Sequence, residues 1–429
     1  MTMQCLIAGC GDTDMEELTN NLNKLPPLSS ECCIYKVPRR LRDVNNKAYT
    51  PQVVSIGPLH HDRKSLKAME EHKMRYMKDF LERTKVRLED LFKNMMEQQA
   101  QIRASYAVAV KFDERELVKI IMIDATFTFE VMLRVSLPSL QNENDRIFGK
   151  PRMLRDIIYD MLLLENQVPF FILEYLYFLA HSKNIIPLER GLSIISLTHK
   201  LFRNRVYKRP FHEISHKFSQ PTTKIHHFVD FLLQCHRPLP SDLPTKKKLK
   251  TLNIPNATEL HQAGVKFEKV KNTKLFDIQF ENGILKIPRL RIRGSTEIFF
   301  RNLIAYEQCE HCDHYINDYV FFMDRLVDSA KDVELLAKSR VLESKLPDSK
   351  ATADFINNLD LGPILFSRKS YFTDLCDKLN DHYGDPCHEW KASLKQDYFK
   401  SPWASLSIIV AAILVVLTFI QTVCSVMEL

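Results

Sequence analysis

Four residues in the C-terminal half carry the side chains that metal ions bind most readily: Cys309, His311, Cys312 and His314. Thiolate and imidazole groups are zinc ligands, and two cysteines separated by two residues have the spacing of many zinc sites. However, the cluster directly follows a predicted helix, and no second ligand pair lies close by in the sequence. We therefore treat Cys309, Cys312 and His314 as weak candidates only, interpret the cluster as structural or incidental, and predict no metal and no cofactor.

Three carboxylates on or near another predicted helix have the chemistry of a general acid and base. Asp156 and Asp160 lie one helical turn apart on the same face, and Glu165 follows them. We favour a structural interpretation, in which these groups are hydrogen-bonded where Asn166 and Gln167 enter the core. The chain also contains no phosphate-binding loop, nucleophile elbow, zinc-protease motif or protein-kinase motif. We therefore assign no catalytic residue and do not favour an enzyme.

Helices are expected to position most of these groups, because apolar residues recur at three- and four-residue spacing along much of the chain. The clearest stripe runs from Leu154 to Leu162 and predicts a helix that begins near Pro151, and Pro169 is expected to kink or split it. Other helices are expected over residues 66–81, 88–110, 115–135, 297–309, 319–333, 370–383 and 388–398. Thr258 and Thr296 are expected as N-caps, and Gly264 as the residue that follows a two-turn helix.

One β-hairpin interrupts this helical pattern. Apolar and polar residues alternate over 276–280 and again over 285–287, and Asn282-Gly283 stands between the two runs. Asn-Gly between alternating segments is the strongest short-range hairpin signal. The predicted fold class is therefore mainly α. We expect one helical domain with a small β-hairpin element, plus one C-terminal transmembrane helix.

The predicted domain organisation has a main domain over residues 32–400 and a loosely ordered N-terminus over residues 1–31. Residues 203–256 hold six prolines with little periodicity, together with a run of lysines at 246–250. We interpret them as a Pro-rich, basic surface insertion around one short helix at Lys224 to Cys235. Glycine is scarce, at 10 residues, while 45% of residues are hydrophobic, which favours a helical domain with a substantial core.

The extreme C-terminal segment predicts a membrane anchor. No charged residue occurs from Ser401 to Met427, and the core of this segment, Ala404 to Val423, would form about 30 Å of helix, which matches the hydrocarbon thickness of a bilayer. The predicted transmembrane helix covers residues 404–426. Its expected membrane contacts are Trp403 at the interface and the apolar residues Leu406, Ile409, Ile413, Leu417 and Ile420.

The flanking charges predict the orientation of this anchor. Lys391, Lys395 and Lys400 precede it, so the positive-inside rule places the N-terminal domain in the cytosol. We expect a tail-anchored, single-pass protein of the plasma membrane or an endomembrane, without a signal peptide. Ten dispersed cysteines agree with a reducing compartment. A net charge of +7 falls short of the concentrated basic face of nucleic-acid-binding proteins, so the expected partners are the lipid bilayer and a protein, and not a nucleic acid.

Five ordered motifs resemble the signatures of the plant domain of unknown function 247 family. They are Ile34-Tyr-Lys-Val-Pro-Arg-Arg-Leu-Arg with Ala48-Tyr-Thr-Pro-Gln-Val-Val-Ser-Ile-Gly-Pro-Leu-His-His61, Asp160-Met-Leu-Leu-Leu-Glu-Asn-Gln-Val-Pro-Phe-Phe-Ile-Leu173, Ala257 to Phe267, Thr296 to Cys309, and Tyr398-Phe-Lys-Ser-Pro-Trp403. The resemblance spans residues 32–425. It implies a C-terminal membrane helix and, in some grass relatives, self-incompatibility between pollen and stigma, but it supplies no catalytic residue.

The leading functional hypothesis is therefore a membrane-anchored interaction or recognition module of unknown biochemical activity. A tether of this kind raises the effective concentration of the domain near its partners. The alternative is a membrane-surface enzyme with an unrecognised active site, which a deep pocket of convergent polar groups would favour. A weaker third hypothesis, a membrane-perturbing protein, would require helices that expose an apolar face.

Overall fold

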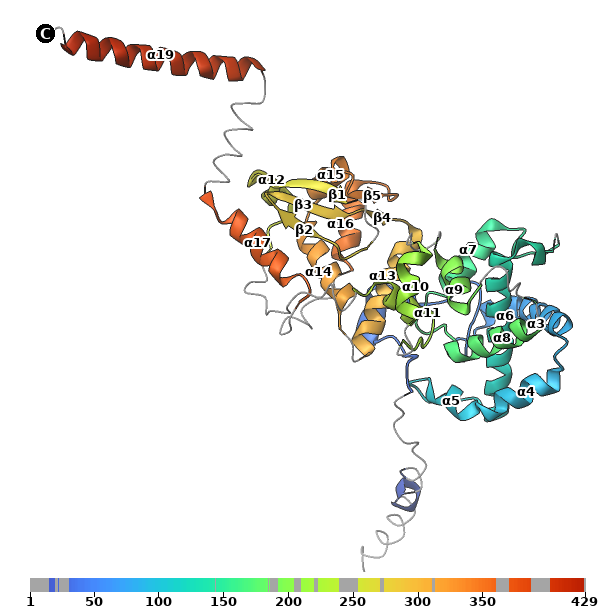
Figure 1. Cartoon of the computed structure of the whole chain (residues 1–429). Helices are drawn as coiled ribbons and strands as arrows, with labels where there is room; N and C mark the ends of the chain where they lie inside the picture. Colours follow the sequence, from blue (N-terminus) through green and yellow to red (C-terminus); the bar gives the residue numbers. More distant parts are fainter. Residues whose placement is uncertain are drawn as a thin grey trace, which may run out of the picture.

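The computed structural model describes residues 15–19, 22, 31–142, 144–183, 185, 192–203, 210–219, 223–238, 254–270, 274–310, 313–359, 370–386 and 402–427. These residues are mainly helical and include two small β-sheets. In Figure 1 several short helices of the first half surround one long helix, α6 (Glu114–Ser136), while the strands and the helices that accompany them gather on the other side of α11 (Phe228–His236) and α13 (Gly294–Cys309). The expected mainly helical fold with a small sheet element is therefore confirmed.

The first half of the chain is built from short helices around one long helix. Its α-helices are α2 (Arg39–Val44), α3 (Glu70–Thr84), α4 (Leu88–Glu97), α5 (Gln99–Ala104), α6 (Glu114–Ser136), α7 (Pro151–Asp160), α8 (Phe170–Ser182), α9 (Ile194–Phe202), α10 (Phe211–Phe218) and α11 (Phe228–His236). Three 3-10 helices join them: η1 (Asn46–Tyr49), η2 (Lys64–Met69) and η3 (Pro138–Leu140).

Helix α6 is the centre of this half. Sixteen of its 23 residues are buried, and it packs against α3, α4, α5, α8 and α9. Such a helix has little need of a polar face, since neighbouring helices cover it all round. The side chain of Asp113 accepts a hydrogen bond from the backbone nitrogen of Glu116 at 2.8 Å and so caps the first turn. Its bounds agree closely with the helix predicted over 115–135.

The described residues of the second half form two sheets and, before α19, six helices. The helices are α12 (Ala257–Gln262), α13 (Gly294–Cys309), α14 (Tyr315–Leu326), α15 (Ala330–Lys338), α16 (Ser349–Asn357) and α17 (Thr373–Tyr383). The strands are β1 (Lys266–Val270), β2 (Gln279–Glu281), β3 (Ile284–Pro288), β4 (Leu290–Ile292) and β5 (Leu342–Ser344). The strand order is β1-β3-β2 in one sheet, and β4 pairs with β5 in the other.

The predicted hairpin is confirmed. Strands β2 and β3 are antiparallel, and Asn282 and Gly283 join them with φ angles of 52° and 73°. Both values lie in the left-handed region that a tight two-residue turn requires. Strand β1 adds to β3 in parallel, and β4 pairs with β5 in parallel. The sequence pattern did not predict these parallel pairs.

Several predicted helices have other bounds in the structure. The helix expected over 319–333 is divided between α14, which ends at Leu326, and α15, which begins at Ala330. The helix expected over 88–110 is divided into α4 and α5 and ends at Ala104. Asn256, rather than Thr258, caps α12, because its side chain accepts from the backbone of Glu259 while the Glu259 side chain accepts from the backbone of Asn256. Helix α13 begins at Gly294, so Thr296 lies inside its first turn.

The predicted surface insertion is wrong for residues 228–236. They form the expected short helix, α11, but all nine residues are buried and the helix packs against α13. The reason is that Phe228, Val229, Phe231 and Leu232 present apolar side chains to core residues on several sides of the helix. The lysine run at 246–250 and the helix expected over 388–398 lie outside the described residues, as does most of the segment 1–31.

Helix α19 (Pro402–Met427) is the last element of the described chain. Its backbone is described throughout, whereas the side chains of residues 402–406, 408–409, 412 and 424–426 are not. Across the described part of the chain, no helix meets the combined length and apolarity needed to cross a membrane. The transmembrane assignment of residues 404–426 therefore stays a prediction.

Candidate functional site

The last residue of α7 and the segment between α7 and α8 carry four polar side chains into the core. Asp160, Glu165, Asn166 and Gln167 are each at least 96% buried, and they belong to the second of the sequence motifs described above. The segment leaves the helical path at Met161, and the rigid ring of Pro169 precedes the first residue of α8. The predicted helix is therefore interrupted, but the break begins at Met161, and Pro169 marks the start of α8 and does not split one helix.

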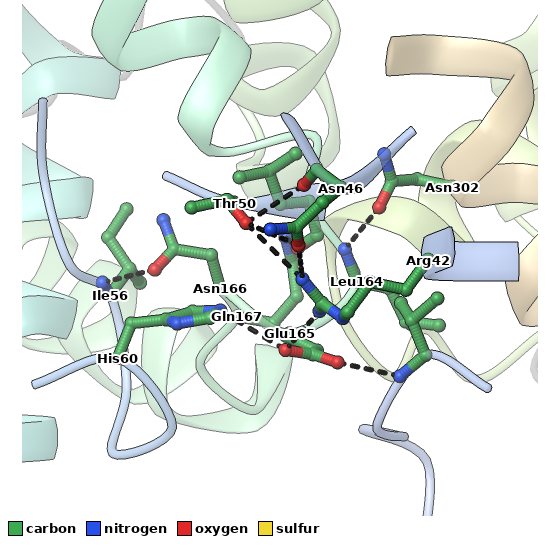
Figure 2. A network of polar contacts seen from close by, with 12 residues as sticks. Arg42, Asn46, Thr50, Ile56, His60, Leu164, Glu165, Asn166, Gln167 and Asn302 are labelled. Carbon is green, nitrogen blue, oxygen red and sulfur yellow. Dashed lines mark hydrogen bonds and ion pairs between the residues drawn. The ribbon is translucent and has the colours of Figure 1, made fainter. Parts of the chain in front are cut away.

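Asp160 and Asn166 fasten the extended segment 52–56. The carboxylate of Asp160 accepts hydrogen bonds from the backbone nitrogens of Gln52, Val53 and Val54 at 2.9, 2.7 and 2.8 Å. Asn166 Oδ1 accepts from the nitrogen of Ile56 at 2.7 Å, as Figure 2 shows. Burial raises the pKa of Asp160 to about 6, against the opposing effect of the three amides.

Glu165 connects three separate points of the first sequence motif. Its Oε1 accepts from the backbone nitrogen of Val37 at 2.7 Å, while its Oε2 lies 2.7 Å from Nη2 of Arg42 and 3.2 Å from Nε2 of His60 (Figure 2). Burial raises the pKa of Glu165, but the hydrogen bond from His60 and the charge of Arg42 outweigh it, so the net pKa lies below its ordinary value. Glu165 therefore remains ionised as the anchor of this segment.

Gly57 turns the chain where its backbone lies against the backbone of Gln167. Its φ angle is +78°, and its backbone nitrogen donates to Oδ2 of Asp124 at 2.8 Å. Oδ1 of Asp124 in turn lies 2.7 Å from Nζ of Lys73, whose side chain is completely buried. Burial lowers the pKa of Lys73, but Asp124 and Glu70 outweigh it and raise the net pKa. A buried ion pair thus holds the turn.

Gln167 extends the network to α11. Its Oε1 accepts from the backbone nitrogen of Phe228 at 3.0 Å, and its Nε2 donates to the carbonyl oxygens of Met161 and Leu163, both at 2.8 Å. The hydroxyl of Tyr106 donates to the carbonyl oxygen of Gln167 at 3.0 Å. The amide side chain of Gln167 therefore shapes its own loop and joins it to a helix sixty residues later in the chain.

Asn302 on α13 brings the second half of the chain into the same network. Its Oδ1 accepts from the nitrogen of Leu164 at 2.9 Å, as Figure 2 shows. Its Nδ2 donates to the carbonyl oxygens of Ala48 and Ile298 at 2.9 and 2.8 Å. One side chain of the fourth sequence motif thus contacts the first and second motifs together. We call the network around Glu165, Asn166, Gln167, Asp124 and Asn302 the motif junction.

The geometry of the motif junction supports the structural interpretation of the carboxylates. Both oxygens of Asp160 and both oxygens of Glu165 are occupied by donors from the protein. Asp156 lies apart from this network, because its carboxylate is partly exposed and pairs with Arg155 at 3.1 Å. The three carboxylates therefore do not converge as a general acid and base.

The described residues give the metal candidates no support. Cys309 is half-buried, and burial raises the pKa of its thiol to about 11, which opposes the thiolate form that zinc needs. Cys312 lies outside the described residues, and His314 stands at the start of α14. No group of three or more histidine, cysteine, aspartate or glutamate residues is placed to hold a metal ion in the part of the chain that the structure describes.

His227 illustrates how the buried histidines are used. Its Nε2 lies 2.9 Å from the carbonyl oxygen of Cys33, and its Nδ1 accepts from the nitrogen of Asp230 at 3.2 Å. Burial lowers the pKa of His227 to about 3, so the ring is neutral and the Nε2 hydrogen points to Cys33. This histidine fastens the start of the first motif to α11.

Glu307 and Glu130 are further buried ionisable groups that the sequence analysis missed, in addition to Lys73 and Asp124. Glu307 accepts hydrogen bonds from the nitrogens of Ile316 and Asn317 at 2.9 and 3.0 Å and so caps α14, although burial raises its pKa to about 8. Glu130 pairs with Arg83 at 3.0 Å in the centre of α6. Each lies within an otherwise apolar stretch of its helix, and this signal in the sequence could have identified both.

Comparison with known proteins gives one family and two curated relatives. The family model described as "Plant protein of unknown function" (domain of unknown function 247) matches residues 34–417. The UPF0481 protein At3g47200 of Arabidopsis thaliana is 27% identical over 424 residues, covering 92% of this chain and 87% of that protein. The putative UPF0481 protein At3g02645 of the same plant is 23% identical over 479 residues, covering 90% of this chain and 89% of that protein. No solved structure matches the chain.

Proposed function

This chain belongs to the plant family of unknown function 247, and from that premise we propose that it is a recognition module that α19 holds at a membrane. The polar groups of the motif junction are engaged in holding the fold together, so the proposal leaves recognition to the surface of the domain. The membrane supplies the place where a partner is met, since tethering raises the effective concentration of the domain there.

The observation that carries the proposal is the exposure of apolar side chains on α19. Ile413, Leu417 and Ile420 are each about half exposed, and Val415 and Phe419 are 69% and 70% exposed. Apart from Thr418, every residue from 413 to 420 is apolar, so the helix is apolar on all its faces in this stretch. A lipid environment would cover all of these faces, whereas packing on one protein surface would cover a stripe. At 26 residues the helix would be about 39 Å long.

The proposed orientation follows from charge. Lys391, Lys395 and Lys400 precede α19, and a cytosolic domain keeps these lysines on the cytosolic side. The proposed location is the plasma membrane or an endomembrane, and the proposed partners are the bilayer and a second protein.

The anchor can be tested with charges placed at the middle of α19. Replacing Ile413→Lys and Leu417→Lys should each cost about 2.5–3.5 kcal/mol of insertion free energy at the centre of a spanning helix. We expect the full chain to resist alkaline carbonate extraction from microsomes and the double variant to be extracted. The matched control places lysines at Ser407 and Gln421, near the helix ends, where long side chains reach the interface. Equal extraction of the unaltered chain and the double variant would overturn the anchor.

Topology and recognition need separate measurements. Protease added to sealed microsomes should degrade the domain, and a protected domain would overturn the cytosolic orientation. Proximity labelling in plant tissue should identify a protein whose purified form binds the full chain saturably in vesicles. The recognition proposal fails if the purified chain instead turns over a small molecule with no partner present.

A further inference from the structure

Strand β4 carries a row of arginines. Arg289, Arg291 and Arg293 occupy alternate positions in and beside the strand, so their side chains share one face. The intervening Leu290 and Ile292 are 7% and 1% exposed and face the core. Since alternate residues of a strand lie about 6.6 Å apart, the row extends along the outer face for about 13 Å.

The neighbouring strand adds a fourth cation to this face. Strands β4 and β5 are parallel, with Arg291 opposite Glu343, and the nitrogen of Lys345 donates to the carbonyl oxygen of Ile292 at 3.1 Å. Glu343 and Lys345 are two residues apart and therefore point to the same side as the arginines. We call Arg289, Arg291, Arg293 and Lys345 the basic face.

Charge on the basic face is only partly balanced. Nη2 of Arg289 lies 2.6 Å from Oε2 of Glu343, and Nε of Arg291 lies 3.2 Å from the same oxygen. Among the described residues, no further carboxylate forms an ion pair with Arg293 or Lys345 within 4.0 Å. Four cations against the single carboxylate leave a net charge of about +3 on the face at neutral pH.

The basic face is partly exposed. The side chains of Arg289, Arg291 and Glu343 are each 34% exposed, so their polar ends reach solvent while their stems lie on the sheet. Helix α13 begins immediately after Arg293, and a Cβ on Gly294 would meet no atom within 4 Å. The partial positive charge at the start of this helix adds to the potential of the four side chains.

From these observations we infer that the basic face docks on the anionic phosphate headgroups of the membrane to which the chain is attached. Arg289 and Arg291 meet at the Glu343 carboxylate, but the cations as a set extend along about 13 Å of the strand, which fits a plane of many headgroups better than a single phosphate. Guanidinium groups match phosphate oxygens with two parallel hydrogen bonds. The inference rests on the proposed membrane attachment, and it adds that the domain lies against the leaflet in a defined orientation.

The experiment measures binding of the full chain to vesicles without insertion. The chain carries Ile413→Lys and Leu417→Lys, and the vesicles contain phosphatidylcholine alone or phosphatidylcholine with phosphatidylserine. We expect binding to the anionic vesicles only. Neutralising Arg291, Arg293 and Lys345 to Gln should weaken it about fivefold per charge, or about a hundredfold in total. Glu343→Gln should strengthen binding about fivefold, because it raises the net charge of the face.

A matched control distinguishes the contribution of the basic face to vesicle binding from the contribution of the net charge of the chain. Arg75→Gln, Lys78→Gln and Arg87→Gln remove three cations from exposed positions outside the basic face, each of which pairs with its own carboxylate. This control should change binding by no more than about twofold at physiological salt. Equal loss in the two triple variants would overturn the inference, as would unchanged binding in Glu343→Gln.

Two further outcomes are distinguishable. A soluble phosphoserine peptide that binds the basic face while anionic vesicles do not would assign the face to a phosphorylated protein and overturn the lipid inference. The proposed membrane anchor is tested separately, by carbonate extraction of the chain with unaltered α19. That result does not depend on the basic face.

Discussion

The backbone of Gly57 lies directly against that of Gln167: a Cβ atom on Gly57 would be 2.4 Å from the Gln167 carbonyl oxygen. The same Cβ would be 3.0 Å from the hydroxyl of Tyr106, which itself donates to that carbonyl. Because Gly57 also has a φ angle of +78°, its place in the first sequence motif is explained by geometry. The first two motifs therefore pack backbone to backbone.

Gly57→Ala should be strongly destabilising. The left-handed conformation costs an alanine about 1–2 kcal/mol, and displacing the Gln167 backbone adds to that cost, so we expect a loss of about 3 kcal/mol or more. Circular dichroism during urea denaturation of the full chain would measure it as a lower midpoint. Gly283→Ala, also at positive φ but with the nearest atom, Cε1 of His382, 3.7 Å from the added Cβ, should show the conformational cost alone. Gly294→Ala should be nearly neutral, and a Gly57→Ala loss no larger than that of Gly283→Ala would contradict the close packing.

Lys73→Met should strongly destabilise the protein, because it breaks the buried ion pair with Asp124. The variant leaves the Asp124 carboxylate almost fully buried without its cation, and breaking such a pair costs about 3–5 kcal/mol. Replacing both partners, as Lys73→Met with Asp124→Leu, should recover part of the loss, although the nitrogen of Gly57 then loses its acceptor. Lys78→Met is the control, since Lys78 forms an exposed pair with Glu82 on the same helix and should matter by no more than about 0.5 kcal/mol. Urea midpoints that are equal for Lys73→Met and Lys78→Met would disprove the structural role.

The sequence predicted those elements whose bounds depend on neighbouring residues in the chain. The bounds of α6 follow from its periodic apolar residues and the cap at Asp113, and the hairpin follows from the conformations that Asn282 and Gly283 adopt readily. The parallel pairing of β4 with β5 was not predictable in the same way, because Leu290 and Leu342 are far apart in the chain. Register between such distant segments depends on how the intervening helices pack.

The sequence predicted that polar side chains of the motif junction are hydrogen-bonded, but it did not predict which groups they bind. The sequence indicated that Asp160 and Glu165 are hydrogen-bonded where Asn166 and Gln167 enter the core, and the structure agrees. Their main partners are backbone amides. Every residue except proline has such a group, so the residue types do not show which amides will donate. Neither the burial of Lys73 among the apolar residues of α3 nor its pairing with Asp124 on α6 was predicted.

Glu165→Gln should change how stability depends on pH. The pKa of Glu165 in the folded protein lies below its ordinary value of 4.5, so its ionised form contributes stability above pH 4.5. This contribution is lost as the pH falls through the lowered folded-state pKa. The unaltered chain should therefore be more stable than Glu165→Gln at pH 7 by about 1.5–3 kcal/mol, and the difference should narrow below pH 4.5. Urea midpoints of both proteins between pH 3 and 7 test this, and a difference that widens in acid would refute it.

Asn302→Ala should loosen the contact between the two halves of the chain. The variant leaves the nitrogen of Leu164 and the carbonyl oxygen of Ala48 without their partner, and each buried unpaired group costs about 1–3 kcal/mol. Because both groups belong to the motif junction, hydrogen exchange followed by mass spectrometry should show faster exchange over residues 44–56 and 160–168 together. The contact between α3 and α6 should keep its protection, since Asn302 does not reach it. Asn358→Ala serves as the control, because its exposed side chain donates to the carbonyl oxygen of Asp354 on the same helix at 2.7 Å, outside the motif junction. Faster exchange in just one of the two segments would show that Asn302 does not couple them.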